Sequence, residues 1–308
     1  MKALRIFLPL YLKILEKLSR GHGYGKKKPI RKILRTFEKS FRASEVIVHG
    51  HKMHIPKKGF GDYATYGIYG ELDTLAVEKL VQKGDYTIDI GAAIGYFSLL
   101  FARAVSESGK VIAFEPKEGR CKILSQNLSL NGYNNVTIEN SAVMSTNIKP
   151  KFFSRHDTIA GLRYIKDENI HYDYLETYKF QKPVEVNAID LDGYLTKHNI
   201  LEKISFMKID VDGPELFVLQ SGKKLLQNPN LIILMEWDQE TAKWSGYEPA
   251  EIIDFLHKNN FKIYYPNFKK NNFFYVEKDE LLNLDPDDQT INILCVKDEA
   301  ILEKSNLL

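Results

Sequence analysis

The chain has 308 residues, of which 44% are hydrophobic and 27% charged, and it contains 17 Tyr and 17 Phe. This composition is typical of a folded globular protein and excludes an intrinsically disordered chain, while the length allows one or two domains. The two cysteines, Cys121 and Cys295, have neither metal-ligand spacing nor a disulfide framework, which favours a reducing compartment.

The positive charge is concentrated in the first 42 residues. They contain 13 Lys or Arg and two Glu, a balance of +11, whereas the rest of the chain sums to −8. Apolar residues at helical spacing predict helices here, and no uncharged run approaches the roughly 20 residues that span a bilayer. We interpret residues 1–42 as a basic helical extension. Its helices either pack on the domain or on a second subunit, or rest on an anionic membrane surface.

Residues 46–55 alternate between apolar and polar side chains and predict a hairpin that leads into the domain. His49, His51 and His54 lie in it, but no cysteine or carboxylate joins them at ligand spacing. We interpret them as solvent-facing strand residues rather than as a metal site. A helix is predicted next, over residues 71–81, and Glu71 is its first residue.

Residues 86–97 predict a buried strand, a glycine loop and the start of a helix. Gly91 and Gly95 permit a tight turn and the close approach of a ligand. Their G-x-x-x-G spacing differs from the G-x-G-x-x-G of dinucleotide-binding loops, and Asp89 would repel a pyrophosphate. A carboxylate here favours a cationic ligand, and S-adenosylmethionine carries an ammonium and a sulfonium.

The next strand, residues 111–114, ends at Glu115 and Pro116. A carboxylate at this strand end can accept hydrogen bonds from both ribose hydroxyls of an adenosine. After a helix over residues 119–130, a third strand over residues 136–142 would bring its polar end beside the adenine. Two acids at consecutive strand ends, with glycines between them, indicate an S-adenosylmethionine-dependent methyltransferase. The predicted cofactor-binding residues are Glu71, Asp89, Gly91, Ala92, Gly95, Tyr96, Glu115, Pro116, Ser141 and Ala142.

Regular patterns fail between residues 143 and 183. A long irregular insertion beside the cofactor edge is either a lid that recognises the substrate or a structural excursion. His156 lies in it and is a candidate mobile base, because histidine titrates near neutrality. A lone loop histidine is also often merely exposed.

The second half of the chain repeats the alternation of strands and helices. Strands are predicted over residues 184–189, 204–211, 231–235, 261–265, 273–276 and 290–296, and helices over residues 215–226 and 249–259. The near-continuous apolar run at 204–211 is typical of a parallel strand covered on both faces. We therefore predict an α/β fold over residues 43–308, a doubly wound, mostly parallel sheet with antiparallel C-terminal strands.

Acidic residues follow two of these strands, at the edge where open α/β sheets bind ligands. Asp210 and Asp212 follow one strand and Glu236 follows the other. A hydroxyl acceptor must lose its proton to attack a methyl group, so each of the three is a candidate general base. As an alternative, the three could hold a divalent cation such as Mg²⁺ that lowers the pKa of the acceptor. Carboxylates at strand ends also cap helices, so the need for a metal stays open.

Lys208 lies two residues before Asp210, on the same face of an otherwise apolar strand. A buried lysine with a lowered pKa could act as the base. The alternative is an ion pair with Asp190 or Asp210 that fixes the edge of the sheet.

With these residues in place, the chain resembles the FkbM family of S-adenosylmethionine-dependent methyltransferases over roughly residues 68–240. The matching segments are residues 89–95, 114–116, 124–131, 188–192, 208–215 and 234–236. The run Lys-Ile-Asp-Val-acid-Gly-x-Glu is much more specific than the glycine loop. The family usually has Glu where Asp212 stands and Ala where Pro214 stands.

The resemblance implies a Rossmann-like class I methyltransferase fold and O-methylation of a hydroxyl on a sugar, glycan or other small acceptor. A nucleic acid is not expected as partner, because the Asn/Asp-Pro-Pro-aromatic signature is absent and neither cysteine follows a proline. The alternatives are a membrane-associated or nucleic-acid-directed methyltransferase and a catalytically inactive binding protein of the same fold. We expect a cytoplasmic protein, with residues 1–42 as its candidate membrane contact.

Overall fold

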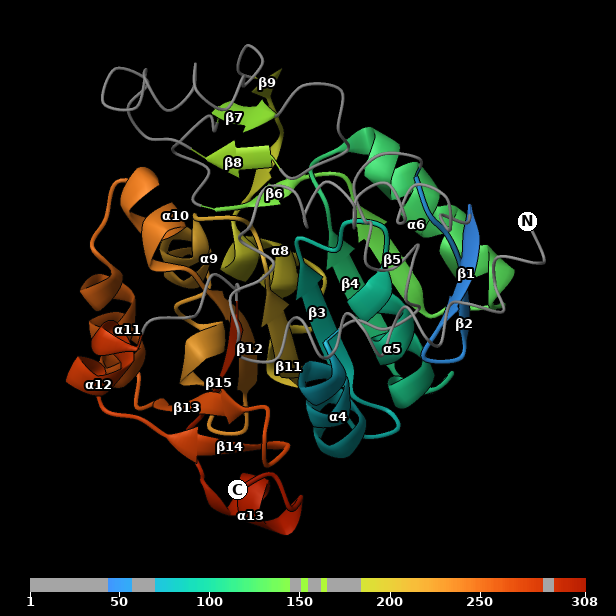
Figure 1. The fold of residues 1–308 in the computed structure, drawn as a ribbon. Helices are drawn as coiled ribbons and strands as arrows, with labels where there is room; N and C mark the ends of the chain where they lie inside the picture. Colours follow the sequence, from blue (N-terminus) through green and yellow to red (C-terminus); the bar gives the residue numbers. More distant parts are fainter. Residues whose placement is uncertain (1–43, 57–69, 145–150, 155–161, 165–183, 285–290) are drawn as a thin grey trace, which may run out of the picture. The chain divides into compact units, whose positions relative to one another are not determined.

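The computed structural model describes residues 44–56, 70–144, 151–154, 162–164, 184–284 and 291–308 (Figure 1). The chain divides into two compact units, Met1–Tyr69 and Gly70–Leu308, and each is described by itself. The predicted extension over residues 1–42, His156 and most of the predicted insertion lie outside the described residues. Within the described part of the chain, no helix is both long and apolar enough to cross a membrane.

The first unit contains the predicted hairpin, formed by β1 (Glu45–Val48) and β2 (His51–His54). His54 lies 3.3 Å from the carboxylate of Glu45 across the hairpin. The interpretation of the histidines as solvent-facing is wrong for His51, which is only 3% exposed. Strand alternation explains the difference, because His51 shares one face of the strand with Met53, which is also buried.

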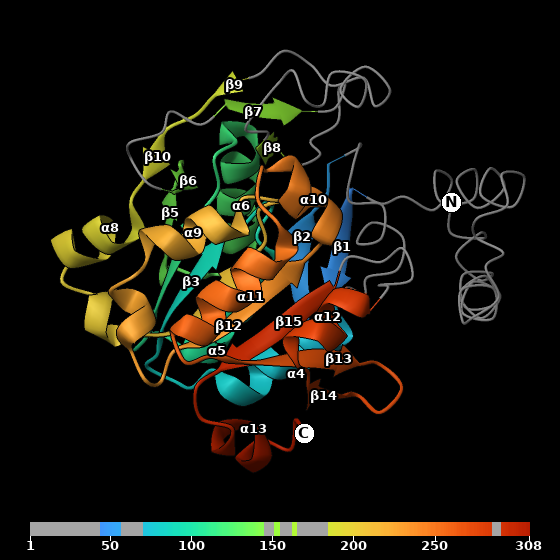
Figure 2. The ribbon, with the colours of Figure 1, turned by 90° about the vertical axis from the view of Figure 1, so that its left-hand side faces the viewer.

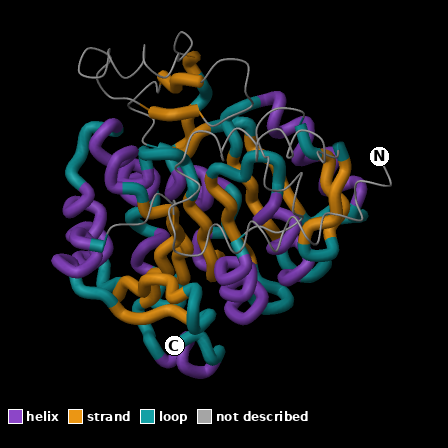
Figure 3. The backbone as a smooth tube through the Cα atoms, in the orientation of Figure 1, coloured by secondary structure: helices purple, strands orange, loops and turns teal. Residues whose placement is uncertain are grey.

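The second unit is built on an eight-stranded sheet, whose order is β14-β13-β15-β12-β11-β3-β4-β5. The strands β5, β4, β3, β11 and β12 run parallel, and β15, β13 and β14 add antiparallel pairs at one side. Figure 3 shows strands in orange with helices in purple around them. Their bounds are β3 Tyr86–Ile90, β4 Lys110–Phe114, β5 Val136–Glu139, β11 Ile204–Ile209, β12 Ile232–Trp237, β13 Lys262–Asn267, β14 Asn272–Tyr275 and β15 Ile291–Val296. This sheet confirms the predicted Rossmann-like fold.

Helices cover both faces of the sheet (Figures 1 and 2). One face carries α4 (Glu71–Leu80), α5 (Tyr96–Val105) and α6 (Glu118–Leu130), and the other carries α8 (Leu191–Lys197), α9 (Glu215–Ser221) and α11 (Pro249–Lys258). Shorter helices are α10 (Gln239–Trp244), α12 (Lys278–Asn283) and α13 (Ala300–Lys304), with 3₁₀ turns at Leu201–Lys203 and Leu225–Gln227. The sequence predicted α4, α5, α6 and α11 within two residues, but the helix predicted over residues 215–226 ends at Ser221 and is followed by a separate 3₁₀ turn. It missed α8, α10, α12 and α13.

Strand alternation makes the two faces of the sheet chemically different. Toward α8, α9 and α11 the strands present apolar side chains, among them Ile90, Ile209, Met235 and Ile293, in one buried core. The opposite face contains polar residues near the carboxyl ends of the strands, namely Asp89, Lys208, Glu236 and Asn292. Polar side chains therefore gather on the α4 and α5 face, near the edge where the parallel strands end.

Two predicted strands are wrong as continuous elements. The predicted strand over residues 136–142 ends at Glu139, and β6 (Ala142–Val143) pairs with β10 (Ala188–Ile189) outside the main sheet. The predicted strand over residues 184–189 is likewise divided, into β9 (Val184–Glu185) and β10. The chain turns at Asn140, whose side chain donates to the carbonyl oxygen of Glu115 at 2.9 Å. Ala142 and Met144 then donate to the chain at residues 187–189 instead of pairing with β4.

The insertion is also more regular than predicted. The strands β7 (Lys151–Ser154) and β8 (Leu162–Tyr164) form a three-stranded antiparallel sheet with β9. Its strands contain only two to four residues, too few for a period-two pattern to emerge from the sequence.

Gly95 permits the tight start of α5, and replacing it with alanine is expected to lower the free energy of unfolding by about 2 kcal/mol. Its φ is 99°, and an added Cβ would lie 2.2 Å from Leu124 Cδ1. The matched control is Gly119→Ala, where no atom lies within 4 Å of the added Cβ and a gain of about 0.5–1 kcal/mol is expected. Urea unfolding measures both, and equal effects would contradict the assignment.

Candidate functional site

The glycine loop between β3 and α5 lies at the point where the strand order reverses. From β3 the chain proceeds to β4 and β5 on one side, and β11 lies on the other side. The backbone N–H groups of Gly91 and Ala92 donate to the carbonyl oxygen of Phe114, at 2.9 and 3.0 Å. A Cβ on Gly91 would lie 1.8 Å from the carbonyl oxygen of Asp210, so only glycine fits there. Open α/β sheets bind their ligands at this place.

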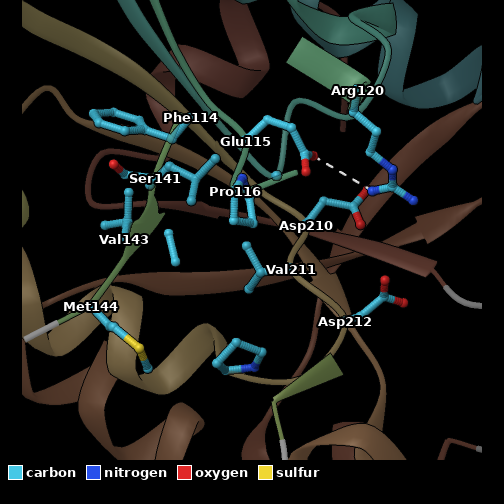
Figure 4. Close-up of a pocket in the computed structure, with 14 residues that line it drawn as sticks. Phe114, Glu115, Pro116, Arg120, Ser141, Val143, Met144, Asp210, Val211 and Asp212 are labelled. Atoms are coloured by element: carbon cyan, nitrogen blue, oxygen red, sulfur yellow. Dashed lines mark ion pairs between the residues drawn. The ribbon is translucent and has the colours of Figure 1, made fainter. Parts of the chain in front are cut away.

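A pocket of about 470 Å³, part of it open to solvent, lies beside this loop (Figure 4). It joins the end of β4, the segment after β5 and the end of β11. The lining residues are Ile90, Gly91, Phe114, Glu115, Pro116, Arg120, Ser141, Ala142, Val143, Met144, Asp210, Val211, Asp212 and Pro214. The pocket therefore brings together predicted cofactor-binding residues and two of the predicted catalytic carboxylates.

Glu115 is the most tightly held carboxylate of the pocket and is 2% exposed. It accepts hydrogen bonds from the backbone N–H groups of Ala93 and Lys117, at 3.0 and 2.8 Å. The guanidinium of Arg120 lies 3.5 Å from its Oε2. Burial raises the pKa of Glu115, and these three donors oppose that shift. Since a carboxylate has about four acceptor positions, Glu115 retains capacity for a further donor.

The other end of the pocket is largely apolar. Phe114, Val143 and Met144 line it together with Ser141 and Ala142 (Figure 4). The backbone N–H of Ser141 donates to Glu139 and that of Met144 to Ile189, which fixes the segment after β5. A flat heterocycle with polar edges fits such a surface.

The other predicted cofactor-binding residues do not line the pocket. Asp89 is 2% exposed and accepts a hydrogen bond from the hydroxyl of Ser98 on α5. Burial raises its pKa from 3.8 to about 6, against the opposing effects of Ser98 and Lys208. Ala92, Gly95 and Tyr96 form the loop and the first turn of α5, and the Tyr96 hydroxyl contacts Thr74. Glu71 is exposed at the start of α4.

Lys208 lies beneath the site and is completely buried. Its ammonium donates to Asp210 Oδ2 at 3.2 Å, to the carbonyl oxygen of Ile209 at 3.2 Å and to Asn292 Oδ1 at 2.7 Å. Of the two interpretations of Lys208, the ion pair with Asp210 is the one present in the structure. Asp190, the other predicted partner, instead caps α8 by accepting from the N–H of Gly193.

Four carboxyl groups gather at the ends of β11 and β12. Asp210 and Asp212 line the pocket, and the side chain of Asp210 is 32% exposed. Glu215 accepts from the N–H of Gly213 at 3.1 Å, which turns it into the loop rather than the pocket. Burial raises the pKa of both Glu215 and Glu236, and the neighbouring carboxylates raise both further. Among the described residues, Glu236 Oε2 is buried without a hydrogen-bond partner.

The alternative of a divalent metal held by Asp210, Asp212 and Glu236 finds no ligand set in the part of the chain that the structure describes. No three His, Cys, Asp or Glu side chains are placed there to hold an ion. Asp212 also has a left-handed backbone, with φ of 59°. Aspartate adopts this conformation more readily than glutamate, which accounts for the shorter carboxylate at this position.

Sequence reasoning missed Arg120, Val143, Met144 and the pair Asp73 and Asn292 that surrounds Lys208. For Arg120 the available signal was a basic residue in the helix after Glu115. For Asn292 it was a single polar residue in an apolar strand. No local pattern identifies Asp73, whose carboxylate meets Asn292 across 219 residues of sequence.

Comparison of the sequence with models of protein families matches the chain to one family. The model of the family described as "Methyltransferase FkbM domain" matches residues 89–263. A search of curated proteins returned no match.

Three solved structures illustrate the likeness of fold. An FkbM methyltransferase from Methylobacillus flagellatus KT has 11% identity and a TM-score of 0.38, covering 68% of this chain and 43% of its own. A SAM-dependent O-methyltransferase from Thermotoga maritima has 16% identity and a TM-score of 0.39, and the match covers 83% of this chain and 78% of that protein. An rRNA methylase from Streptococcus thermophilus has 15% identity and a TM-score of 0.37, and the match covers 73% of this chain and 90% of that protein.

Proposed function

This chain belongs to the FkbM methyltransferase family, and from that premise we propose that it methylates a hydroxyl oxygen of a sugar, a glycan or another small hydroxylated acceptor. It is a methyltransferase that uses S-adenosylmethionine, which supplies an electrophilic methyl group on a sulfonium. The acceptor class is the part that we propose. The alternative acceptor is a nucleic acid, and a test of acceptors must therefore include RNA.

One observation carries the proposal. Glu115 at the end of β4 and Asp210 at the end of β11 line the same pocket, on either side of Gly91. A ribose-binding carboxylate and a carboxylate for the acceptor are what transfer from S-adenosylmethionine to a hydroxyl requires at one site.

The described residues suit the cofactor. We assign the remaining acceptor position of Glu115 to a ribose hydroxyl, and the apolar walls of Phe114, Val143 and Met144 suit an adenine. Asp89 brings negative charge close to the glycine loop, and this charge favours the ammonium and the sulfonium.

Asp210 is the best candidate for the general base. It lines the pocket and is partly exposed, so that an acceptor hydroxyl can reach it. As the oxygen–methyl bond forms and the sulfur–methyl bond breaks, the hydroxyl proton passes to the carboxylate of Asp210. Lys208 is fully buried and donates to three acceptors, which leaves it a positioning role. Glu236 remains the alternative base, and the role of His156 stays a prediction.

The test is methyl transfer from labelled S-adenosylmethionine to a panel of glycans, glycolipids, small alcohols and RNA, with and without EDTA. We expect label on a glycan or alcohol and none on RNA. Label on RNA alone would overturn the proposed acceptor class. Loss of transfer in EDTA, restored by Mg²⁺, would show that transfer needs a divalent metal, the alternative for which Asp210, Asp212 and Glu236 are the candidate ligands.

Replacing Glu115 with alanine is expected to weaken S-adenosylmethionine binding about 10- to 100-fold, because a charge-assisted hydrogen bond to the ribose is lost. The matched control is Glu118→Ala, which removes an exposed carboxylate three residues away that pairs with Lys122 at 2.7 Å. Isothermal titration calorimetry measures both dissociation constants. Unchanged affinity in Glu115→Ala would contradict the assignment of the ribose site.

We further propose a cytoplasmic protein whose basic extension, residues 1–42, contacts anionic membranes peripherally. The charge of +11 on this segment supports the proposal. Flotation with phosphatidylserine vesicles, comparing the full chain with a chain lacking residues 1–42, tests it. Equal flotation of the two would argue against it.

A further inference from the structure

We propose that Asn292 is a positioning residue for cofactor binding, because its amide holds the Lys208 ammonium away from Asp89, so that the negative charge of the buried Asp89 carboxylate, beside the glycine loop, is left to attract the cationic cofactor. This inference rests on the proposed function. It concerns two residues, Asn292 and Lys208, that come from different strands of the sheet and lie outside the pocket lining.

Asp89 and Lys208 are natural partners by position. They face each other in register on the adjacent parallel strands β3 and β11. Residues in register point to the same face of a sheet, and neighbouring strands lie about 4.8 Å apart. An extended lysine side chain spans that distance easily, so a direct ion pair would be expected from the sheet alone.

The structure directs the ammonium elsewhere. Lys208 Nζ donates to Asn292 Oδ1 at 2.7 Å, to Asp210 Oδ2 at 3.2 Å and to the Ile209 carbonyl at 3.2 Å. An ammonium has three donors, and these acceptors use all of them. It also lies 5.1 Å from the centre of the Phe97 ring. Asp89 instead accepts from the hydroxyl of Ser98.

The orientation of Asn292 is fixed from its other end. Its Nδ2 donates to Asp73 Oδ2 at 2.7 Å, in the first turn of α4. An ammonium has only donors and a carboxylate only acceptors, so one orientation of the amide satisfies both partners. Asp73 is buried, which makes this bridge a rigid link between α4, β15 and β11.

The electrostatic consequence concerns Asp89. The charge of Lys208 lowers the pKa of Asp89, and the charge of Asp210 raises it. The same ammonium also lowers the pKa of Asp73 on α4 and of Glu236 on β12. A Lys208 ammonium paired directly with Asp89 would neutralise the carboxylate, and a cationic ligand would have to break that pair. Asn292 prevents the pair from forming and thereby preserves the attraction for the cofactor.

The test compares two ligands and two backgrounds by isothermal titration calorimetry. In Asn292→Leu, which keeps the branching at Cγ but loses the amide, S-adenosylmethionine should bind about tenfold more weakly, whereas neutral 5′-methylthioadenosine should bind unchanged. In the Lys208→Met background, the Asn292→Leu substitution should have no further effect, because no ammonium remains to move. The affinity for S-adenosylmethionine falls at low pH as Asp89 becomes protonated. In Asn292→Leu this fall should occur at lower pH, since the adjacent ammonium would lower the pKa of Asp89.

A purely structural role predicts other results. If Asn292→Leu only loosens the fold, both ligands lose affinity and the loss persists in the Lys208→Met background, which overturns the inference. Should Asn292→Leu fail to fold, Asn292→Ser, which is polar but too short to bridge, gives the same comparison. A wild-type chain that binds no S-adenosylmethionine overturns the proposed function and this inference with it. Wild-type binding with no effect of Asn292 overturns the inference alone.

Discussion

Replacing Asp89 with asparagine is expected to make the cofactor-free protein more stable above pH 6 while weakening S-adenosylmethionine binding about 10- to 100-fold. The affinity falls because a charge-assisted interaction with a cationic ligand is lost. The stability rises because burial makes the ionised carboxyl costly and raises its pKa from 3.8 to about 6. The two effects have opposite signs, which separates a functional carboxylate from a structural one.

The sign of the stability effect follows from proton binding. Between pH 3.8 and about 6 the native carboxyl keeps a proton that the unfolded chain has released. Stability from this group therefore declines as the pH rises through that window, by about 3 kcal/mol in total. Asparagine cannot ionise, so the variant should gain about that amount at pH 8 and little at pH 4.

Urea unfolding at pH 4 and pH 8, with calorimetry for the cofactor, measures both effects. The control is Asp254→Asn, which removes an exposed carboxylate paired with Lys278 and should change unfolding by less than about 1 kcal/mol. An Asp89→Asn variant that is less stable at pH 8 and binds S-adenosylmethionine normally would contradict the assignment of Asp89 to the cofactor site.

Replacing Asp210 with asparagine is expected to lower kcat about 100-fold or more, because a positioned general base contributes about 10²–10⁴ to the rate. Asparagine has the same shape and still accepts from Lys208, so the ion-pair geometry beneath the site is largely kept. S-adenosylmethionine affinity should therefore change by less than about threefold, or about 0.7 kcal/mol. Single-turnover methyl transfer to an acceptor identified from the panel measures the effect.

Glu236→Gln is the matched comparison for Asp210→Asn. Glu236 is the alternative base, but it does not line the pocket. We expect its substitution to lower kcat less than tenfold. A larger loss in Glu236→Gln than in Asp210→Asn would reverse the assignment of the base.

Patterns among neighbouring residues predicted the main strands and the residues at their ends. The alternation of apolar strands and helices identified β3, β4, β11 and β12, and the spacing of Gly91 and Gly95 identified the loop. Asp89 and Glu115 could be predicted as cofactor-binding residues because Asp89 is the next-to-last residue of β3 and Glu115 directly follows β4, relations within a few neighbouring residues. The same local reasoning gave Lys208 two interpretations and could not choose between them, since the choice depends on which strands lie beside β11.

Long-range pairing decided the rest. The third strand divides because Ala142 and Met144 pair with the chain near residues 187–189 rather than with β4. His51 and Met53 share a buried face that the hydropathy pattern alone did not reveal.

The α/β class, the glycine loop and the candidate cofactor carboxylates Asp89 and Glu115 could be predicted from sequence, because each prediction depends on residues close together along the chain. The partners of these carboxylates and of Lys208 become visible only in the folded chain. Lys208 meets Asn292 across 84 residues, and Asn292 meets Asp73 across 219. Hydrogen bonds between such distant residues exist only after the sheet has set the order of its strands, and no periodicity in the sequence encodes that order.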